Sequence, residues 1–290
     1  MPAQEIRLTA ADGTVIAADV CLPPGERSAA LLVAPAMGVP RRFYRHLCSW
    51  LSEHGYLCLA LDYRGIGGSA PDKLRGYDAT ILDWVHDLNA AHTYLKRSFE
   101  PMPHFFLGHS IGAQLIGLMD DYDGFKAHFF VATGTGAFSH FEGPGRLKVG
   151  LFWKVFLPVL TAVYGYLPGW IFGSKTHVPA KIARQWRRWG LSEDYLFSHI
   201  GGEIPAEQPH FTDVSGKLIA YTFTDDTLIP RSNLEHLLKF YPATDQTIRQ
   251  IAPEDIGREK IGHMGFFFKT SEKQLWPMLL ADLQQQTLNF

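Results

Sequence analysis

Residues 108–112, Gly-His-Ser-Ile-Gly, constrain the fold of this 290-residue chain more than any other stretch. The apolar run before them, residues 104–107, predicts a buried strand, and residues 113–119 after them predict a helix. A strand that turns this sharply into a helix holds the corner residue in strained backbone angles, and glycines are needed because side chains there would collide. We therefore predict a strand–turn–helix corner with the Ser110 hydroxyl pushed out at its tip.

A serine at such a corner is a candidate nucleophile, and its hydroxyl needs a base that is oriented by a carboxylate. The C-terminal half supplies an acid and then a histidine, the chain order typical of this corner. Asp225 and Asp226 both follow a predicted strand, 217–223; the Asp-x-x-x-Pro spacing favours Asp226, and we interpret Asp225 as a helix-capping or solvated loop acid. His263 lies between two glycines in a loop and is the predicted base.

His109, next to the serine, is interpreted differently, as a packing residue that points away from the corner tip and hydrogen-bonds behind the strand. A tetrahedral intermediate also needs two backbone N–H donors. We assign these to Ile111, directly after the serine, and to Met37, in the loop after the predicted strand at 29–34.

Strand and helix patterns alternate along the chain, which predicts a mostly parallel sheet covered on both faces. The predicted helices are 42–54, 79–97, 111–121, 231–240 and 271–285. The predicted strands are 4–9, 14–22, 29–34, 56–61, 104–108, 127–132, 217–223 and 246–251.

Over its full length the sequence resembles an α/β-hydrolase. The opening 11–18 resembles the first hairpin of that fold, and 62–69, Asp-Tyr-Arg-Gly-Ile-Gly-Gly-Ser, resembles the loop after its fourth strand. A closer resemblance, to bacterial α/β-hydrolases without assigned substrates, is carried by residues 36–44, 165–169, 186–189 and 262–267. It implies an α/β-hydrolase fold with a mostly parallel eight-stranded sheet, helices on both faces and an inserted cap, and the same Ser110, Asp226 and His263.

Composition narrows the functional classes. The chain is 46% hydrophobic and carries a net charge of −2, so nothing favours nucleic-acid binding. Three cysteines without metal-ligand spacing, and a start unlike a signal peptide, favour a reducing, cytoplasmic location. No metal-binding motif or dinucleotide fingerprint is present, so we expect neither a metal nor a cofactor.

The region between the strands ending near 132 and starting near 217 predicts an insertion. We expect 1–137 and 213–290 to form the core domain and 138–212 a helical cap, or lid, that binds the apolar part of a substrate. Residues 155–172 carry no charge and are long enough for a membrane span. Prolines and glycines interrupt them, so an apolar cap is favoured over a span, with peripheral membrane contact left open.

Together these features predict a serine hydrolase that cleaves an ester, or less favourably a thioester or amide, of a hydrophobic small molecule. An acyltransferase with the same three residues is the second hypothesis. A binding module that turns over nothing is the third, and the complete Ser, Asp and His set disfavours it. The sequence predicts neither the natural substrate nor the oligomeric state.

Overall fold

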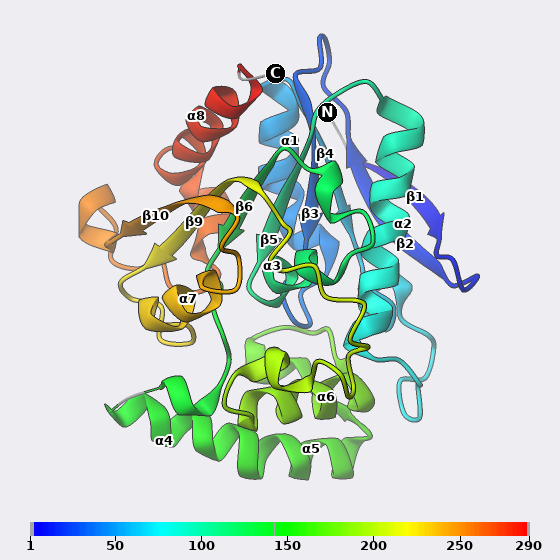
Figure 1. Ribbon diagram of the computed structural model, residues 1–290, viewed down its shortest axis with the longest axis vertical. Coiled ribbons are helices and arrows are strands. Elements are labelled where there is room, and N and C mark those ends of the chain that lie inside the picture. The colour runs from blue at the N-terminus through cyan, green and yellow to red at the C-terminus, as the bar shows by residue number, and fades with distance from the viewer. Residues whose placement is uncertain (1–2, 142, 289–290) are drawn as a thin grey trace.

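The computed structural model describes residues 3–141 and 143–288 (Figure 1). Eight strands form one sheet in the order β1-β2-β4-β3-β5-β6-β9-β10. The β1–β2 and β2–β4 pairs are antiparallel and the other pairs are parallel. This confirms the predicted mostly parallel eight-stranded sheet. The strands are β1 (Gln4–Thr9), β2 (Val15–Cys21), β3 (Ala29–Ala34), β4 (Tyr56–Leu61), β5 (His104–His109), β6 (Ala127–Val131), β9 (Gly216–Phe223) and β10 (Thr244–Ile251).

The central strands are buried on both faces, as their continuous apolar runs require. Every residue of β3, β4 and β5 is buried. One face of the sheet packs against α1 (Arg45–Glu53) and α8 (Leu275–Thr287). The other packs against α2 (Ile81–Phe99), α3 (Ile111–Gln114) and α7 (Arg231–Leu238).

Residues 138–199 form a helical layer, the cap segment, beyond the carboxyl ends of the parallel strands and opposite the two termini (Figure 1). It contains α4 (Gly143–Leu151), a π-helical turn (Phe152–Phe156), α5 (Leu157–Tyr164), a small hairpin of β7 (Tyr166–Leu167) and β8 (Val178–Pro179), and α6 (Ala180–Leu191). Residues 210–214 already run along the core, where the His210 N–H donates to the Gly117 carbonyl at 2.7 Å.

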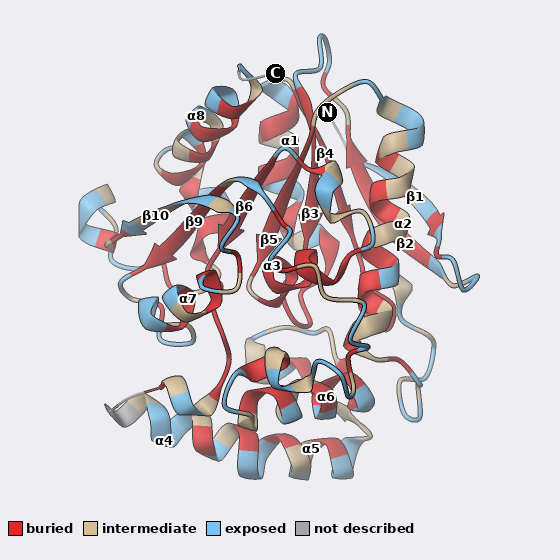
Figure 2. Cartoon of the chain, in the orientation of Figure 1, coloured by how far each residue is buried: buried red, intermediate tan, exposed pale blue. Residues whose placement is uncertain are grey.

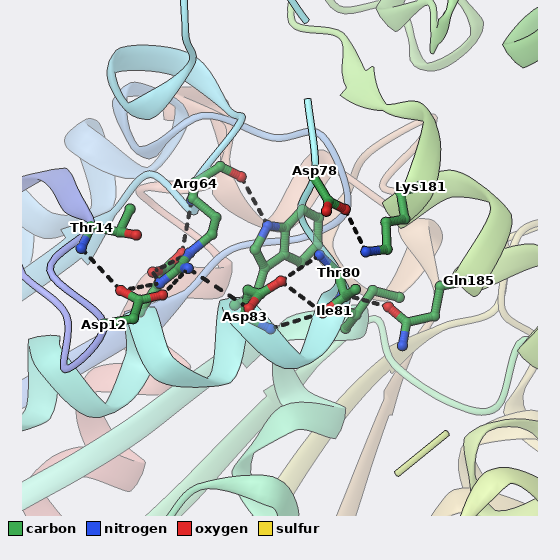
Figure 3. Close-up of polar contacts among 11 residues, drawn as sticks. Asp12, Thr14, Arg64, Asp78, Thr80, Ile81, Asp83, Lys181 and Gln185 are labelled. Carbon is green, nitrogen blue, oxygen red and sulfur yellow. Dashed lines mark hydrogen bonds and ion pairs between the residues drawn. The ribbon is translucent and has the colours of Figure 1, made fainter. Parts of the chain in front are cut away.

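The cap segment is attached to the core through α6, as Figure 3 shows. The Gln185 side-chain carbonyl accepts the Ile81 N–H at 2.5 Å, at the first turn of α2. Lys181, one turn earlier on α6, forms an ion pair with Asp78. These contacts fix α6 as the inner helix of the cap segment, with α4 and α5 outside it.

One predicted element differs from the structure. The helix predicted over 111–121 is α3 followed by a 3₁₀ turn, Leu115–Leu118, and Gly117 in that turn packs directly against the ring of Phe211. The predicted interruption of the uncharged run 155–172 is confirmed, because α5 ends at Tyr164 and Gly165 adopts a left-handed conformation at φ 79°. Pro158, which was also expected to break it, lies within the continuous helix Gly145–Tyr164. Within residues 3–141 and 143–288, one helix, Gly145–Tyr164, is apolar and long enough by composition to cross a membrane, and 22% of its 18-residue apolar window is buried.

Candidate active site

The corner after β5 is as tight as its glycines predict. Ser110 has φ 53° and ψ −122°, a strained conformation for a residue with a side chain. A Cβ on Gly108 would lie 2.2 Å from the Cα of Ala113. The Ser110 backbone is fixed on both sides, because its N–H donates to the Val131 carbonyl at 3.0 Å and its carbonyl accepts the Thr133 hydroxyl at 2.7 Å. The serine is therefore presented from a rigid support at the centre of the sheet.

Asp226 and His263 lie together in the loops that follow β9 and β10. The Asp226 Oδ2 and the His263 Nδ1 are 2.8 Å apart. The other carboxylate oxygen, Oδ1, accepts the N–H groups of Leu228 and Ile229 at 2.9 and 3.2 Å. Both oxygens of this buried carboxylate are therefore occupied, and the imidazole is held through Nδ1. Within the part of the chain that the structure describes, its Nε2 makes no hydrogen bond, to Ser110 or to any other group.

Asp225 is neither a helix cap nor a solvated acid, and that part of the interpretation is wrong. Its carboxylate accepts the Ile261 N–H at 2.8 Å and the Gly262 N–H at 2.9 Å. Gly262 needs the left-handed φ of 57° in this turn, and His263 follows directly. Asp225 thus anchors the loop that carries the predicted base. The residue pairs lie 36 and 37 positions apart, so no local sequence signal indicates this role.

His109 is fully buried and bonds to the loop that carries His263. Its Nε2 lies 3.1 Å from the His263 carbonyl and therefore donates the proton, while its Nδ1 accepts from the Tyr44 hydroxyl at 2.9 Å. The Tyr44 oxygen in turn accepts the Ala36 N–H at 2.9 Å. Burial holds the pKa of His109 well below its ordinary value, so this ring stays neutral. With both nitrogens engaged, His109 is not available as a base.

This chain of hydrogen bonds joins three segments that are distant in sequence. Ala36 lies in the loop after β3, His109 ends β5, and His263 lies in the loop after β10. The rings of His109 and His263 are 5.3 Å apart between centroids. Tyr44 and His109 therefore set the positions of the predicted oxyanion loop and the predicted base relative to Ser110. Tyr44 was missed by the sequence analysis because only the folded chain brings it to this edge.

The two predicted oxyanion donors lie on segments that touch. A Cβ on Gly112 would lie 2.2 Å from the Ala34 carbonyl oxygen, so the first turn of α3 packs directly on the loop after β3. Met37 and Ile111 are both buried. Among the described residues, no hydrogen-bond acceptor is assigned to the Met37 N–H, as a donor awaiting an oxyanion requires.

A second cluster of titratable groups lies where the cap segment meets the core. His140, Asp194 and His236 bring possible ligand atoms within 4.8 Å of one another. The two rings, however, are 3.8 Å apart between centroids. Imidazoles that share a tetrahedral zinc ion through bonds of about 2.0–2.1 Å keep their centres about 5 Å apart. The geometry is therefore that of two imidazoles in direct contact, tilted by 42°, and burial, followed by the nearby His236, lowers the pKa of His140.

The sequence of this chain matches a known family. The family model described as serine aminopeptidase, S33, matches residues 13–168, more than half of the chain. The chain belongs to this family. S33 proteins are serine hydrolases of the α/β-hydrolase superfamily, as the sequence resemblance implied. The matched region contains Ser110 and ends before Asp226 and His263, whose assignment therefore rests on the geometry above.

Among solved structures, a soluble variant of the Saccharomyces cerevisiae monoglyceride lipase has 13% identity and a TM-score of 0.65, with 99% of this chain and 96% of that chain covered. An esterase from Pyrococcus furiosus has 14% identity and a TM-score of 0.59, over 99% and 91% of the two chains. At these identities the likeness shows the fold alone.

One curated relative of this S33 protein is the Penicillium polyketide transferase GrgF. It is 30% identical over 100 residues, which is 34% of this chain. The match covers 33% of that relative, so this chain spans about a third of its length in the alignment. The crystal structure of Penicillium GrgF has 18% identity and a TM-score of 0.58, over 99% of this chain and 98% of that chain.

Proposed function

We propose that this S33 protein hydrolyses a carboxylic ester of a hydrophobic small molecule through an acyl-enzyme on Ser110. The observation that carries the proposal is the 2.8 Å contact between Asp226 and His263. The His263 ring lies 5.3 Å, between centroids, from the ring of His109, the residue before a serine held at φ 53°. A serine in this strained corner, next to a carboxylate-oriented imidazole, is the arrangement that acyl transfer needs.

In the proposed reaction, His263 takes the Ser110 proton through Nε2 while the serine oxygen attacks the acyl carbonyl. The N–H groups of Ile111 and Met37 stabilise the oxyanion. His263 then gives its proton to the leaving alcohol as the ester bond breaks and the acyl-enzyme forms. In the second half, His263 takes a proton from water, the water oxygen attacks the acyl carbonyl, and the proton returns to the Ser110 oxygen as the carboxylic acid leaves. Asp226 holds the imidazole tautomer and stabilises its positive charge. No step requires a metal or a cofactor.

The preference for a hydrophobic acyl group rests on the surroundings of the two oxyanion donors. Met37 and Ile111 belong to one apolar cluster that continues into the cap segment through Trp153, Val178 and Trp189. A Cβ on Gly38 would lie 2.9 Å from Val178, so this hairpin residue sits directly over the oxyanion loop. An acyl chain that enters beside Ser110 would meet these side chains in place of water.

The test is covalent labelling with a fluorophosphonate, followed by hydrolysis of nitrophenyl esters of increasing chain length. Wild-type protein is expected to be labelled, Ser110→Ala is expected to be unlabelled, and turnover should fall by about a million-fold in the variant. Longer acyl chains should raise kcat/KM. Wild-type protein that resists the probe would contradict the proposal and favour a non-catalytic binding module. A Ser110→Ala variant that is still labelled would contradict it by showing that another residue is the nucleophile.

A second candidate function is acyl transfer to an alcohol or amine acceptor. Its support is the likeness to the polyketide transferase GrgF. The same three residues serve both reactions, and the difference lies in what attacks the acyl-enzyme. A nitrophenyl ester with increasing concentrations of an acceptor alcohol separates them. If the protein transfers the acyl group, millimolar acceptor alcohol should yield the new ester in place of the free acid. If it hydrolyses the ester, the free acid should be the product at every acceptor concentration.

A further inference from the structure

The helix that runs through α4, the π-helical turn and α5 is apolar on both of its faces. Its inner face buries Trp153, Leu157 and Thr161. Helices that are apolar all round are normally enclosed by protein or by lipid. This one is enclosed on one side only, because α5 packs against α6 and the other side faces outward. Figure 2 shows the exposed stretches along the edge of the molecule away from the sheet.

The outward face carries a regular apolar stripe, which we call the outer stripe. Its members recur every four residues and are 43–70% exposed: Leu147, Leu151, Val155, Val159 and Val163. In an α-helix a four-residue spacing drifts round the axis, because one turn takes 3.6 residues. The wider π-helical turn at Phe152–Phe156 reduces that drift. Five large apolar side chains are thus kept along one side of a 20-residue helix.

Positive charge prevails in the segment that carries the outer stripe. Arg146, Lys148 and Lys154 lie on the same helix as the stripe, whereas four further cations lie on the inner helix α6, where Lys181 and Arg188 are ion-paired. From residue 145 to residue 192 the sequence contains eight Lys and Arg and no Asp or Glu, in a chain whose net charge is −2. The excess of acid therefore lies in the rest of the protein. Lys148 and Lys175 are exposed, and within the described residues neither has a carboxylate partner. Arg146 and Lys154 lie over the Phe138 ring, at 4.9 and 4.7 Å from its centre.

We infer that the outer stripe docks this protein on an anionic lipid bilayer, with the helix lying in the plane of the interface. An apolar face edged by cations matches the boundary between acyl chains and anionic headgroups. The acidic remainder of the chain is repelled by the same surface, so the charges also fix the orientation. The inference is independent of the proposed ester hydrolysis.

Two other occupants fit the observations less well. A second copy of the chain would bring two cap segments of like charge face to face, which is unfavourable. A membrane span would place Lys154, near the middle of the helix, in the hydrocarbon core. It would also strip the inner face, with Trp153 and Leu157, from its packing in the apolar core. Lying flat, the helix keeps both contacts and lets Lys154 extend to the headgroups.

Vesicle flotation of the full chain tests the docking. Vesicles are made of phosphatidylcholine alone or with about one third phosphatidylglycerol. We expect at least about tenfold stronger binding to the anionic vesicles, and a loss of binding between about 0.1 M and about 0.5 M NaCl. Because the stripe residues are exposed, Val159→Glu with Val163→Glu should leave folding intact and weaken binding at least about tenfold. Lys148→Gln with Lys175→Gln should weaken binding to anionic vesicles only.

A matched control introduces the same two charges outside the cap segment, at Val15 and Leu288, which are 53% and 88% exposed. Val15→Glu with Leu288→Glu should float like the wild type. Wild-type protein that does not float with anionic vesicles would overturn the inference, and so would equal flotation of the Val159 and Val163 variant. A wild-type dimer in light scattering that this variant converts to a monomer, without flotation of either, would identify a second copy as the occupant.

Discussion

The Asp226→Asn substitution isolates the electrostatic part of the proposed site. The side-chain carbonyl of the introduced amide can keep the two N–H bonds from Leu228 and Ile229, at 2.9 and 3.2 Å. The amide nitrogen then faces the His263 Nδ1 across the 2.8 Å contact. Two donors cannot share that contact, so the imidazole moves its proton to Nε2, the atom that must accept from Ser110.

The expected decrease in kcat is large because an imidazole with its proton on Nε2 cannot accept the Ser110 proton at all. In a triad of this type the same substitution lowers kcat by about 10⁴, or about 5.5 kcal/mol of barrier. The fold should be unaffected, because the side chains are isosteric and the loop bonds remain. The assay is the second-order rate of fluorophosphonate labelling, which needs no knowledge of the substrate, together with hydrolysis of nitrophenyl acetate.

Asp225→Asn is the matched control. The Asp225 carboxylate holds the Ile261 and Gly262 N–H groups and does not contact the imidazole of His263. An asparagine retains one acceptor there, so the free energy of unfolding should fall by about 1–3 kcal/mol. The labelling rate should stay within about tenfold of the wild type. Labelling by the Asp226 variant that is no slower than labelling by the Asp225 variant would refute the assignment of Asp226.

Three further predictions follow from single contacts. Gly112→Ala should lower kcat/KM for nitrophenyl acetate at least about 100-fold, because its Cβ would lie 2.2 Å from the Ala34 oxygen and push α3 off the predicted oxyanion loop. The control Gly25→Ala, at a position with open space around it, should leave kcat/KM unchanged. Tyr44→Phe leaves the Ala36 N–H and the His109 Nδ1 unpaired. Chemical denaturation should therefore show a free energy of unfolding lower by about 1–3 kcal/mol, and kcat should fall about tenfold. An unchanged free energy of unfolding together with an unchanged kcat would contradict the positioning role of Tyr44. Burial lowers the pKa of His128 to about 4, whereas the same residue in the unfolded chain has a pKa of about 6.5. As the pH falls from about 6.5 to about 4, the unfolded state therefore takes up a proton that the folded state does not, and the free energy of unfolding should fall by about 3 kcal/mol. Urea titrations of His128→Gln should show a smaller loss over the same pH range, and an identical pH dependence would contradict the assignment.

The sheet could be predicted from the sequence because its signal is local. Apolar runs such as Leu57–Leu61 and Phe105–Leu107 are continuous where strands are buried on both faces. The strand–turn–helix corner is also local, since five consecutive residues require the turn. The supports of the site are not: Tyr44 meets His109 across 65 positions, and His109 meets the His263 carbonyl across 154. Such contacts depend on which loops share a sheet edge, and composition and periodicity carry no information about that.

The cap segment shows a different limit of sequence reasoning. Hydropathy alone describes Gly145–Tyr164 as apolar, and an apolar lid over a substrate is the natural interpretation. The fold divides that one property between two roles, because Trp153 and Leu157 face inward while Val155 and Val159 face solvent. An inward apolar face is explained by packing, but an outward one is stable in water only at a cost of roughly 25 cal/mol for each Å² left exposed. The five exposed side chains of the outer stripe lie in register on a helix that also carries cations. A lipid surface that removes these side chains from water accounts for this arrangement better than a role in covering the substrate alone.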